Sequence, residues 1–585
     1  MMNRLYNVLC VDLKERRHEI EEIPELFDKF LGGSGLTIEL LLKECPTGAD
    51  PLAPENPVVL APGPLGGLFP SAGKTVAAFK SPVTGNLGES HAGGRLAVSL
   101  RMAGYGALVI KNAADSPTLL EIDDHGVSFR SALPLKGFSS LEVERRLRAC
   151  AAEARMQSIM SIGPAGENRV AYACVNVDRY NYFGRLGLGA VFGSKNLKAI
   201  SIVGSGSIEV SDPDLYKKTF KRLFREEVET DKMAKYHYTG TPANVLVLNE
   251  IGALPTKNFQ MGRFENAEAI SGETLGSDWL DRKVSCPLCP IGCMHVTRLR
   301  PAFAKGYEYE PIDAYSNYES IYALGSNLLV KSAEEVLRLN HQANVVGVDT
   351  MLLGNVLAWM TEAYEKGVIN QAHTGGVIPK WGDTNAYVVM IENIALRSNS
   401  FYDRLAQGLD KTVEAYGGRE FAMTFGGNGP AGYLTGYASV LGTIVGARHS
   451  HNNNAGYDID QRRLHQKMDE DKILKELRQE NEWRYLLTSL VVCLFARRIY
   501  NERRIVDALK AVGIERSVKE LETLGATVHK RAFDFKFREG FDFSKLRIPQ
   551  RAFESATANG KMDETKLKAM LEKYVKAEFG ATLHV

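Results

Sequence analysis

The sequence predicts an α+β protein in which a sheet-rich N-terminal domain precedes two mostly helical domains. With 585 residues, the chain exceeds what one hydrophobic core usually serves, so we expect two to four domains. Up to Gly204, short segments rich in β-formers are joined by glycine- and proline-rich turns. Beyond Ser211, the apolar residues recur instead at the spacing of amphipathic helices.

The sheet-rich part begins at the N-terminus, where "MMNRLYNVLCVDL" alternates polar and apolar residues. This pattern predicts a strand and not a signal peptide. Short segments rich in β-formers and bounded by turn residues continue in "NPVVLAPGPLGGLF", "GKTVAAFKSPVTGNLG", "AGYGALVIKN" and "LLEIDDHGVSFR". We therefore expect a domain dominated by sheet over residues 1–208.

Helices are expected from Ser211 onward, because Ser211-Asp212-Pro213 is a typical helix start. The stretch "SAEEVLRLNHQANVVGVDTMLLGNVLAWMTEAYEKG" is amphipathic throughout, and the glycine pair in "EAYGGRE" marks a soft boundary. These features predict one helical domain over residues 209–415 and a second over residues 416–585.

The composition narrows the class of protein. Lys and Arg total 71 against 70 for Asp and Glu, a balance that argues against a nucleic-acid binder. No apolar run of about 18 residues occurs, so we expect no membrane span. Of the eight cysteines, four lie scattered in apolar surroundings: Cys10, Cys45, Cys150 and Cys174. We expect these to be buried thiols in a reducing compartment, which predicts a cytoplasmic location.

The remaining cysteines form a possible metal site. The run "SCPLCPIGCMH" places Cys286, Cys289 and Cys293 at a C-x₂-C-x₃-C spacing, and its prolines and glycine favour a tight loop. A [4Fe–4S] cluster would take the distant Cys493 as its fourth ligand. The alternatives are a structural zinc ion held by the same three cysteines and His295, or three buried thiols without metal. The spacing favours iron–sulfur over zinc, because the second ligand pair usual in zinc modules is missing.

The run "KVSCPLCPIGCMHVTRL" resembles the cluster loop of the aldehyde ferredoxin oxidoreductases, which are tungsten bis-pterin enzymes. The likeness extends, in order, through "LGGSGLTIELLLKE", "LAPENPVVLAPGPLGG", "KSPVTGNLGESHAGGRLAVSLRMAGYGALVIK", "SIGPAGENRVAYA", "GRLGLGAVFGSKNLKAI", "GALPTKNFQMGRFENAEAISGE" and "NYESIYALGSN". The resemblance implies a two-sheet N-terminal base that carries the pterins, followed by two helical domains with the metal at their junction.

The glycine-rich runs suit a cofactor that carries phosphate. "HAGG" and "GRLGLG" let the backbone approach closely and present N–H groups, and Arg95 and Arg185 can supply positive charge. The resemblance further implies a magnesium ion that bridges the pterin phosphates and is bound by carbonyls near His91 and Tyr182–Phe183. The cofactor-binding residues that we expect are Lys74, His91, Gly93, Gly94, Arg95, Tyr182, Phe183, Gly184, Arg185, Gly187, Asn344, Gly347, Asp349 and Thr488.

This chain departs from the family pattern in several of these places. The family usually carries D-x-x-G-L-[CD] twice, whereas the copies here read "NVVGVD", from Asn344, and "TSLVVC", from Thr488. Both residues keep a hydrogen-bonding group but carry no formal charge. Lys74 stands where the family typically has an arginine, which preserves the charge and loses the forked geometry. Arg338 replaces the glutamate of an intersubunit metal site found in some dimeric members.

Three residues are candidates for catalysis. By resemblance, Glu319 in "NYESIYALG" is the general base toward water, and His449 in "ARHSHN" polarises the carbonyl or binds the metal's oxo group. Tyr318 is expected to donate to the substrate or to pack beneath it, and His451 is a possible neighbour in the same pocket. We expect burial to raise the pKa of the Glu319 carboxyl.

The resemblance implies a tungsten or molybdenum enzyme that oxidises aldehydes to carboxylic acids with water. Its electrons would leave through the [4Fe–4S] cluster to ferredoxin or a small ferredoxin-like subunit, in a homo- or hetero-oligomer. Two alternatives stay open. One is a related tungstopterin reductase of the aromatic acyl-CoA type, in which electrons run inward. The other is a cofactor-carrying electron-transfer subunit without aldehyde turnover.

Overall fold

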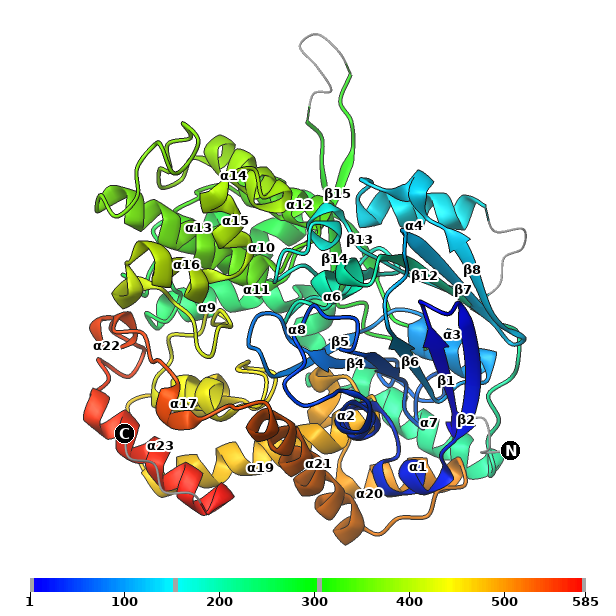
Figure 1. The fold of residues 1–585 in the computed structure, drawn as a ribbon. Coiled ribbons are helices and arrows are strands. Elements are labelled where there is room, and N and C mark those ends of the chain that lie inside the picture. The colour runs from blue at the N-terminus through cyan, green and yellow to red at the C-terminus, as the bar shows by residue number, and fades with distance from the viewer. Residues whose placement is uncertain (1–4, 151–155, 302–307, 581–585) are drawn as a thin grey trace.

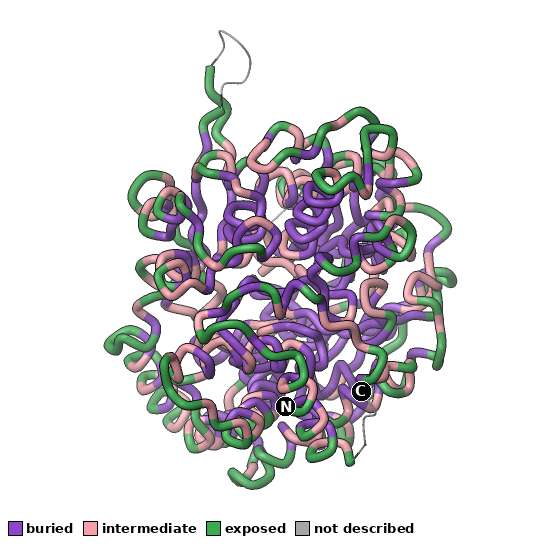
Figure 2. The backbone as a smooth tube through the Cα atoms, turned by 90° about the vertical axis from the view of Figure 1, so that its left-hand side faces the viewer, coloured by how far each residue is buried: buried purple, intermediate pink, exposed green. Residues whose placement is uncertain are grey.

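The computed structural model describes residues 5–150, 156–301 and 308–580 (Figure 1). Residues 1–4 and 581–585, the outer ends of the first and third expected domains, lie outside this part. None of the described helices is long and apolar enough to cross a membrane. Buried residues run through the interior, and exposed ones lie on the outer loops and helices (Figure 2).

The N-terminal part contains two six-stranded mixed sheets, as expected. The first has the order β2-β1-β6-β3-β4-β5 and the second β11-β10-β9-β12-β7-β8, so β5 and β11 are edge strands, and they contact each other. The strands are β1 (Asn7–Asp12), β2 (Arg17–Glu22), β3 (Val58–Ala61), β4 (Thr75–Lys80), β5 (Leu87–Ala92), β6 (Ala107–Lys111), β7 (Thr118–Asp123), β8 (Gly126–Ser131), β9 (Met156–Ser161), β10 (Val175–Val177), β11 (Asn181–Phe183) and β12 (Leu197–Gly204).

The inner strands β3 and β4 of the first sheet are buried on both faces, which explains their continuous apolar runs, whereas the edge strand β2 is exposed. In β3, Val59 packs into the core shared with the C-terminal helices, whereas Val58 and Leu60 pack into the core between the two sheets. This alternation follows from the two-residue period of a strand. The helices of this part are α1 (Pro24–Phe30), α2 (Gly33–Glu44), α3 (Leu96–Ala103), α4 (Ser140–Ala149), α5 (Pro164–Glu167) and α6 (Leu188–Ser194).

The second part is mostly helical, as predicted. Its first helix, α7 (Pro213–Val228), begins where expected, and the Asp212 side chain caps it by accepting the Leu215 N–H at 2.9 Å. The other helices are α8 (Ala234–Tyr238), α9 (Asn244–Glu250), α10 (Gly272–Thr274), α11 (Tyr318–Leu324), α12 (Ala333–Val346), α13 (Thr350–Glu365), α14 (Thr384–Leu396), α15 (Ser400–Ala406) and α16 (Leu409–Tyr416).

A small sheet in this part was not predicted. Strands β13 (Leu280–Val284), β14 (Met294–Leu299) and β15 (Ile312–Tyr315) pair antiparallel in that order, and the cysteine loop connects the first two. The flanking strands are short and adjoin a loop rich in turn residues. They therefore show no long alternating pattern that would predict a sheet.

The C-terminal part is helical and packs back onto the first sheet's helices. Helices α19 and α21 pack against each other and against α2, and α20 packs on α7. The bounds are α17 (Tyr437–Val445), α18 (Gly456–Gln461), α19 (Glu470–Ser489), α20 (Glu502–Ala511), α21 (Val518–Arg538), α22 (Arg551–Glu554) and α23 (Glu564–Phe579). The expected domain limits at residues 208 and 415 stay predictions.

Candidate active site

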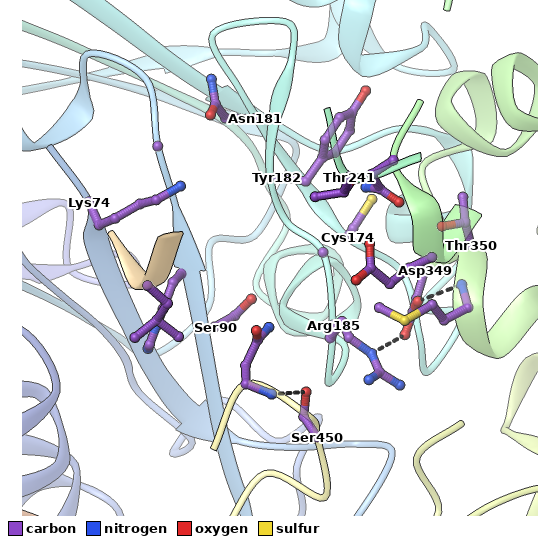
Figure 3. Close-up of a pocket in the computed structure, with 18 of the residues that line it drawn as sticks. Lys74, Ser90, Cys174, Asn181, Tyr182, Arg185, Thr241, Asp349, Thr350 and Ser450 are labelled. Atoms are coloured by element: carbon purple, nitrogen blue, oxygen red, sulfur yellow. Dashed lines mark hydrogen bonds and ion pairs between the residues drawn. The ribbon is translucent and has the colours of Figure 1, made fainter. Parts of the chain in front are cut away.

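A cavity of about 330 Å³ lies where the sheet edges meet the helical parts (Figure 3). The first sheet contributes Lys74 and Ser90, the second Tyr182, and the start of α13 contributes Asp349 and Thr350. Its size falls in the range usual for ligand sites. The fold therefore places a ligand-sized cavity at the junction where the sequence predicts a cofactor.

Most of the expected cofactor-binding residues lie in one place. The cavity is lined by Lys74, His91, Gly93, Tyr182, Gly184, Arg185, Asn344, Asp349 and Thr488. Gly93 has no room for a side chain, since an added Cβ would lie 2.5 Å from Asn181 Oδ1 and 2.6 Å from Cys286 Sγ. Close backbone approach at this glycine is therefore a property of the folded chain.

The other expected cofactor-binding residues do not line the cavity: Gly94, Arg95, Phe183, Gly187 and Gly347. Arg95 is exposed, and its backbone N–H donates to Asp178 Oδ2 at 2.7 Å, so its side chain supplies no charge here. Phe183 packs between the sheets, because it follows Tyr182 on a strand and so points the opposite way. Gly347, at φ +83°, ends α12 and lets the chain turn into α13.

Arg185 and Asp349 form a buried pair on the far side of the cavity (Figure 3). Asp349 caps α13, accepting the Met351 N–H at 2.9 Å, and accepts Arg185 Nε–H at 3.1 Å through its other oxygen. Arg185 Nη2 also donates to Asn428 Oδ1 at 2.6 Å. Its Nη1 is buried without a partner. The guanidinium is thus fixed in place with one donor left over for a ligand.

Sequence reasoning missed a second buried charge cluster. Glu89 Oε1 lies 2.7 Å from His91 Nε2 and 3.8 Å from Arg448 Nη1, and the carboxylate is fully buried. Burial alone would raise the pKa of Glu89, but Arg448 and His91 outweigh it and lower this pKa to about 2. Glu89 Oε2 and Arg448 Nε have no partner. The strand that carries Glu89 reads LGESHA, which is not an apolar run, so the local sequence gave no clear signal that this carboxylate is buried.

Three of the four proposed cluster cysteines line the cavity: Cys286, Cys293 and Cys493. Cys289 lies beside them, with its Sγ 3.4 Å from Ser71 Oγ. Burial alone would lower the pKa of the Lys74 ammonium, but negative charge on the cavity cysteines raises it. The distant Cys493 therefore lies with the loop cysteines around one lysine, and the [4Fe–4S] cluster stays a prediction.

The zinc alternative does not fit this geometry. Met294 faces the cavity, whereas His295, its neighbour on β14, lies in a separate small cavity beside Thr239. Within the described ranges, no three His, Cys, Asp or Glu side chains converge closely enough to hold a single metal ion. Of the scattered cysteines, Cys10, Cys45 and Cys174 are buried as expected, but Cys150 is exposed because it follows the end of the surface helix α4.

Glu319 lines the cavity from the first turn of α11, which the Asn317 side chain caps. The Tyr433 hydroxyl donates to Glu319 Oε1 at 3.1 Å, and His451 Nε2 lies 3.4 Å from the same oxygen. Burial alone would raise the pKa of Glu319, but these partners lower it, His451 most. The expectation of a raised pKa was wrong, because it ignored hydrogen bonds to the charged form.

His449 and Tyr318 are not placed as expected. His449 is fully buried outside the cavity lining, with its Nε2 3.1 Å from Lys536 Nζ. Burial and this lysine lower its pKa, so the ring is neutral. The Tyr318 hydroxyl donates to the Gly432 carbonyl, and its ring packs against Tyr433 at 5.0 Å between centroids. Tyr318 therefore supports a cavity residue, and the histidine that faces Glu319 is His451.

The loop that carries His451 is held by cations from three places. Arg484 of α19 donates to the His451 carbonyl at 2.9 Å, and Arg448 donates to the Asn452 carbonyl at 3.0 Å. Lys536 of α21 donates to the Ala447 carbonyl at 3.0 Å. His451 Nδ1 itself is buried without a partner. The ring is thus held rigidly with one nitrogen available.

Two family models match this chain. The model for the aldehyde ferredoxin oxidoreductase N-terminal domain matches residues 8–204, and the model for domains 2 and 3 of the same enzymes matches residues 217–578. The chain belongs to the aldehyde ferredoxin oxidoreductase family. This confirms the resemblance drawn from the sequence, the fold it implied, and the assignment to the oxidoreductase enzymes.

Individual relatives agree with this family assignment. A tungsten-containing aldehyde ferredoxin oxidoreductase from Thermococcus kodakarensis is 33% identical over 97% of this chain and 95% of its own. One from Pyrococcus furiosus is 33% identical over 97% and 94%. The active-site complex BamBC of benzoyl coenzyme A reductase has the same fold, with a TM-score of 0.81 and 20% identity over 98% of this chain and 94% of that one.

Proposed function

We propose that this enzyme binds a tungsten or molybdenum bis-pterin and oxidises an aldehyde to the carboxylic acid with water. Its electrons then leave through a [4Fe–4S] cluster to ferredoxin or a small ferredoxin-like subunit. One observation carries the proposal. A single cavity is lined both by the Glu319–His451 pair and by Cys286, Cys293 and Cys493. Proton acceptors and an electron path are therefore adjacent to one binding space.

The residues present fit a large polar cofactor. Buried donors and acceptors without partners border the cavity, namely Arg185 Nη1, Arg448 Nε and Glu89 Oε2. Such groups are costly unless a ligand or water bonds them. The missing side chain of Gly93 lets Asn181 and Cys286 lie directly against the backbone at the cavity. Tungsten-containing relatives support tungsten as the metal.

In this proposal Lys74, Arg185, Asn344, Asp349 and Thr488 hold the two pterins by hydrogen bonds and charge. The magnesium ion is bound by backbone carbonyls of His91 and of Tyr182 or Phe183, which lie on the contacting edge strands β5 and β11. When bound, the pterin-ligated metal supplies a two-electron acceptor.

Glu319 acts as the general base toward the attacking water, and His451 is its hydrogen-bonding partner. Hydrogen bonds keep the Glu319 carboxylate ionised, so it accepts the proton at neutral pH. Burial lowers the pKa of His451, so its ring is neutral and Nε2–H donates to Glu319. Nδ1 then carries a lone pair, so His451 accepts a hydrogen bond from water and does not polarise a carbonyl.

The test combines composition and turnover. Protein produced with tungstate should contain about one tungsten or molybdenum, two pterins and four irons per chain, and should reduce a viologen with a panel of aldehydes. Turnover with an aromatic acyl thioester and a low-potential donor, but with no aldehyde, would assign the reductase reaction instead. Full metal loading without either reaction would contradict the proposed activity, and an absence of pterin would contradict the cofactor.

A further inference from the structure

Ser71 carries one hydroxyl proton and has two partners for it. Its Oγ lies 2.9 Å from Glu227 Oε2 and 3.4 Å from the Sγ of Cys289. Its backbone carbonyl also accepts the N–H of Cys493 at 2.8 Å. Ser71 has φ +52°, a conformation uncommon for residues other than glycine and asparagine. A strained backbone thus directs this hydroxyl between a carboxyl group and a proposed cluster ligand.

Glu227 is an unusual carboxyl group. It lies on α7, is 2% exposed, and its Oε1 has no hydrogen-bond partner in the part of the chain that the structure describes. Burial raises its pKa to about 7, although the Ser71 hydrogen bond acts in the opposite direction. The titratable groups that face it are Tyr500, Cys289 and Cys493, which bear no positive charge.

The nearby cations are engaged elsewhere. Arg222 on the same helix bonds Asp507 at 2.7 Å, and Arg504 of α20 bonds Glu226. Lys74 is associated with the cavity cysteines. Among the described residues, Glu227 therefore has no ion-pair partner, and its charge depends on its own proton and on Ser71.

Ser71 has a single hydroxyl hydrogen, so it can donate to Glu227 or to Cys289 but not to both at once. When Glu227 is ionised, Ser71 donates its only hydrogen to the carboxylate and presents a lone pair to Cys289. When Glu227 is protonated, its O–H donates to Ser71, which frees the Ser71 hydrogen for the sulfur. A more negative sulfur favours that second arrangement.

We propose that Glu227 takes up a proton when the cysteine-bound cluster is reduced and that Ser71 transmits this change to Cys289. The inference rests on the proposed function, which supplies the cluster and the electrons. One electron from substrate oxidation enters at the cysteines, and one proton from water forms the O–H bond of Glu227. The Ser71 hydrogen moves from Glu227 to the sulfur. Oxidation by the ferredoxin-like acceptor removes the electron, after which Glu227 releases its proton to water and the Ser71 hydrogen turns back to Glu227.

The experiment is an EPR-monitored redox titration of the cluster-loaded protein between about pH 5.5 and about pH 8.5, a range that brackets a carboxyl group titrating near neutrality. The wild-type midpoint potential should fall as pH rises. Full coupling of one proton to one electron changes the reduction equilibrium about tenfold per pH unit, which is about 59 mV. Partial coupling gives a smaller slope of the same sign.

Glu227→Gln should abolish the slope. Its amide donates to Ser71 at every pH, so the hydroxyl stays on Cys289 and the potential stays near the wild-type value at low pH. Ser71→Ala should also flatten the slope, but at a lower potential, because the sulfur loses its donor. The matched control is Glu229→Gln, an exposed position at the end of the same helix, which should keep the wild-type slope.

A second readout uses the wild type alone, so it does not require the variants to retain their cluster. The reduced-minus-oxidised infrared spectrum of the wild type should gain the carbonyl stretch of a protonated carboxylic acid. A midpoint potential independent of pH, or a slope that survives in Glu227→Gln, would overturn the inference while leaving the proposed function intact. Absence of iron and of a reduced-cluster EPR signal would instead contradict the proposed function itself.

Discussion

Two groups of cavity residues differ in how their charges are compensated. The cluster wall, which comprises Cys286, Cys293, Cys493 and Lys74, places cysteine sulfurs around one ammonium group. The acid–base wall, which comprises Glu319, Tyr433 and His451, holds one carboxylate with two hydrogen-bond donors. When ionised, the cysteines of the cluster wall need a metal to compensate their negative charge. The carboxylate of the acid–base wall is stabilised by its hydrogen-bond donors alone. Changes to the first should therefore alter composition, and changes to the second should alter only rate.

The largest effect is expected on the cluster wall. Cys493→Ala should lose the [4Fe–4S] cluster and with it all measurable viologen reduction, because the fourth thiolate is gone. Iron content and the broad visible absorption measure this loss. Cys174→Ala is the matched control, since Cys174 lines the same cavity but lies outside the cluster wall. Unchanged iron in Cys493→Ala would remove this residue from the ligand set.

Glu319→Gln should come next and should act on rate alone. The amide keeps the shape of the side chain but cannot accept the proton from water, a loss that typically costs about 10²–10⁴-fold. Steady-state aldehyde oxidation at equal metal loading measures it, with the exposed Glu414→Gln as control. Activity above about a tenth of wild type would move the role of base away from Glu319.

Two histidines in one loop give the sharpest contrast. His451→Gln should lower kcat about 10- to 100-fold, because it removes a hydrogen bond to a charged group at the reacting site. His449→Gln should leave turnover per loaded site near wild type but lower the apparent melting temperature, because His449 lies in a buried network with Lys536. The reverse pattern would restore the role first assigned to His449.

The smallest effect concerns pH. Activity requires both Glu319 and His451 to be unprotonated, and both pKa values are lowered. Turnover should thus stay level through neutral pH and fall only below about pH 6.5, the ordinary histidine value. Tyr433→Phe removes a donor that favours the carboxylate, so the pKa of Glu319 should rise and the acid limb should move to higher pH.

In Tyr433→Phe, kcat at neutral pH should fall only about 5-fold, the usual worth of one hydrogen bond. A pH–rate profile of both proteins checks the prediction. An acid limb that moves to lower pH, or does not move, would show that the Tyr433 hydroxyl does not stabilise the Glu319 charge.

The sequence predicts the cluster wall better than the acid–base wall, because the first depends on local spacing and the second on contacts between distant segments. The cluster loop is a local pattern, since ligand spacing and turn residues lie within a few positions of one another. Asp349 was also accessible, because it caps a helix in a recognisable motif. The choice of His451 over His449 depends on which way each ring points in a loop held by Arg484 and Lys536. These two residues lie on helices far along the chain, so the sequence around the two histidines does not indicate their contacts.

Arg95 and Glu89 illustrate the same limit. Arg95 follows a glycine run that suits a phosphate, but the chain turns there and its side chain is exposed. Glu89 lies in a buried strand, where the neighbouring Arg448, from a segment more than 350 residues away, helps His91 to stabilise the carboxylate. Contacts between distant segments decide both cases.

Long-range contacts of this kind also set the order in which the protein can be made. Lys536 donates to Asn86 Oδ1 at a separation of 450 residues, and Ser34 bonds Thr488 across 454. A ribosome adding about 5–20 residues per second needs roughly 20–90 seconds to cover such a distance. Throughout that interval the sheet edges that line the cavity exist without the helices that close it. The cavity therefore cannot close around any bound group until the last helices have been made.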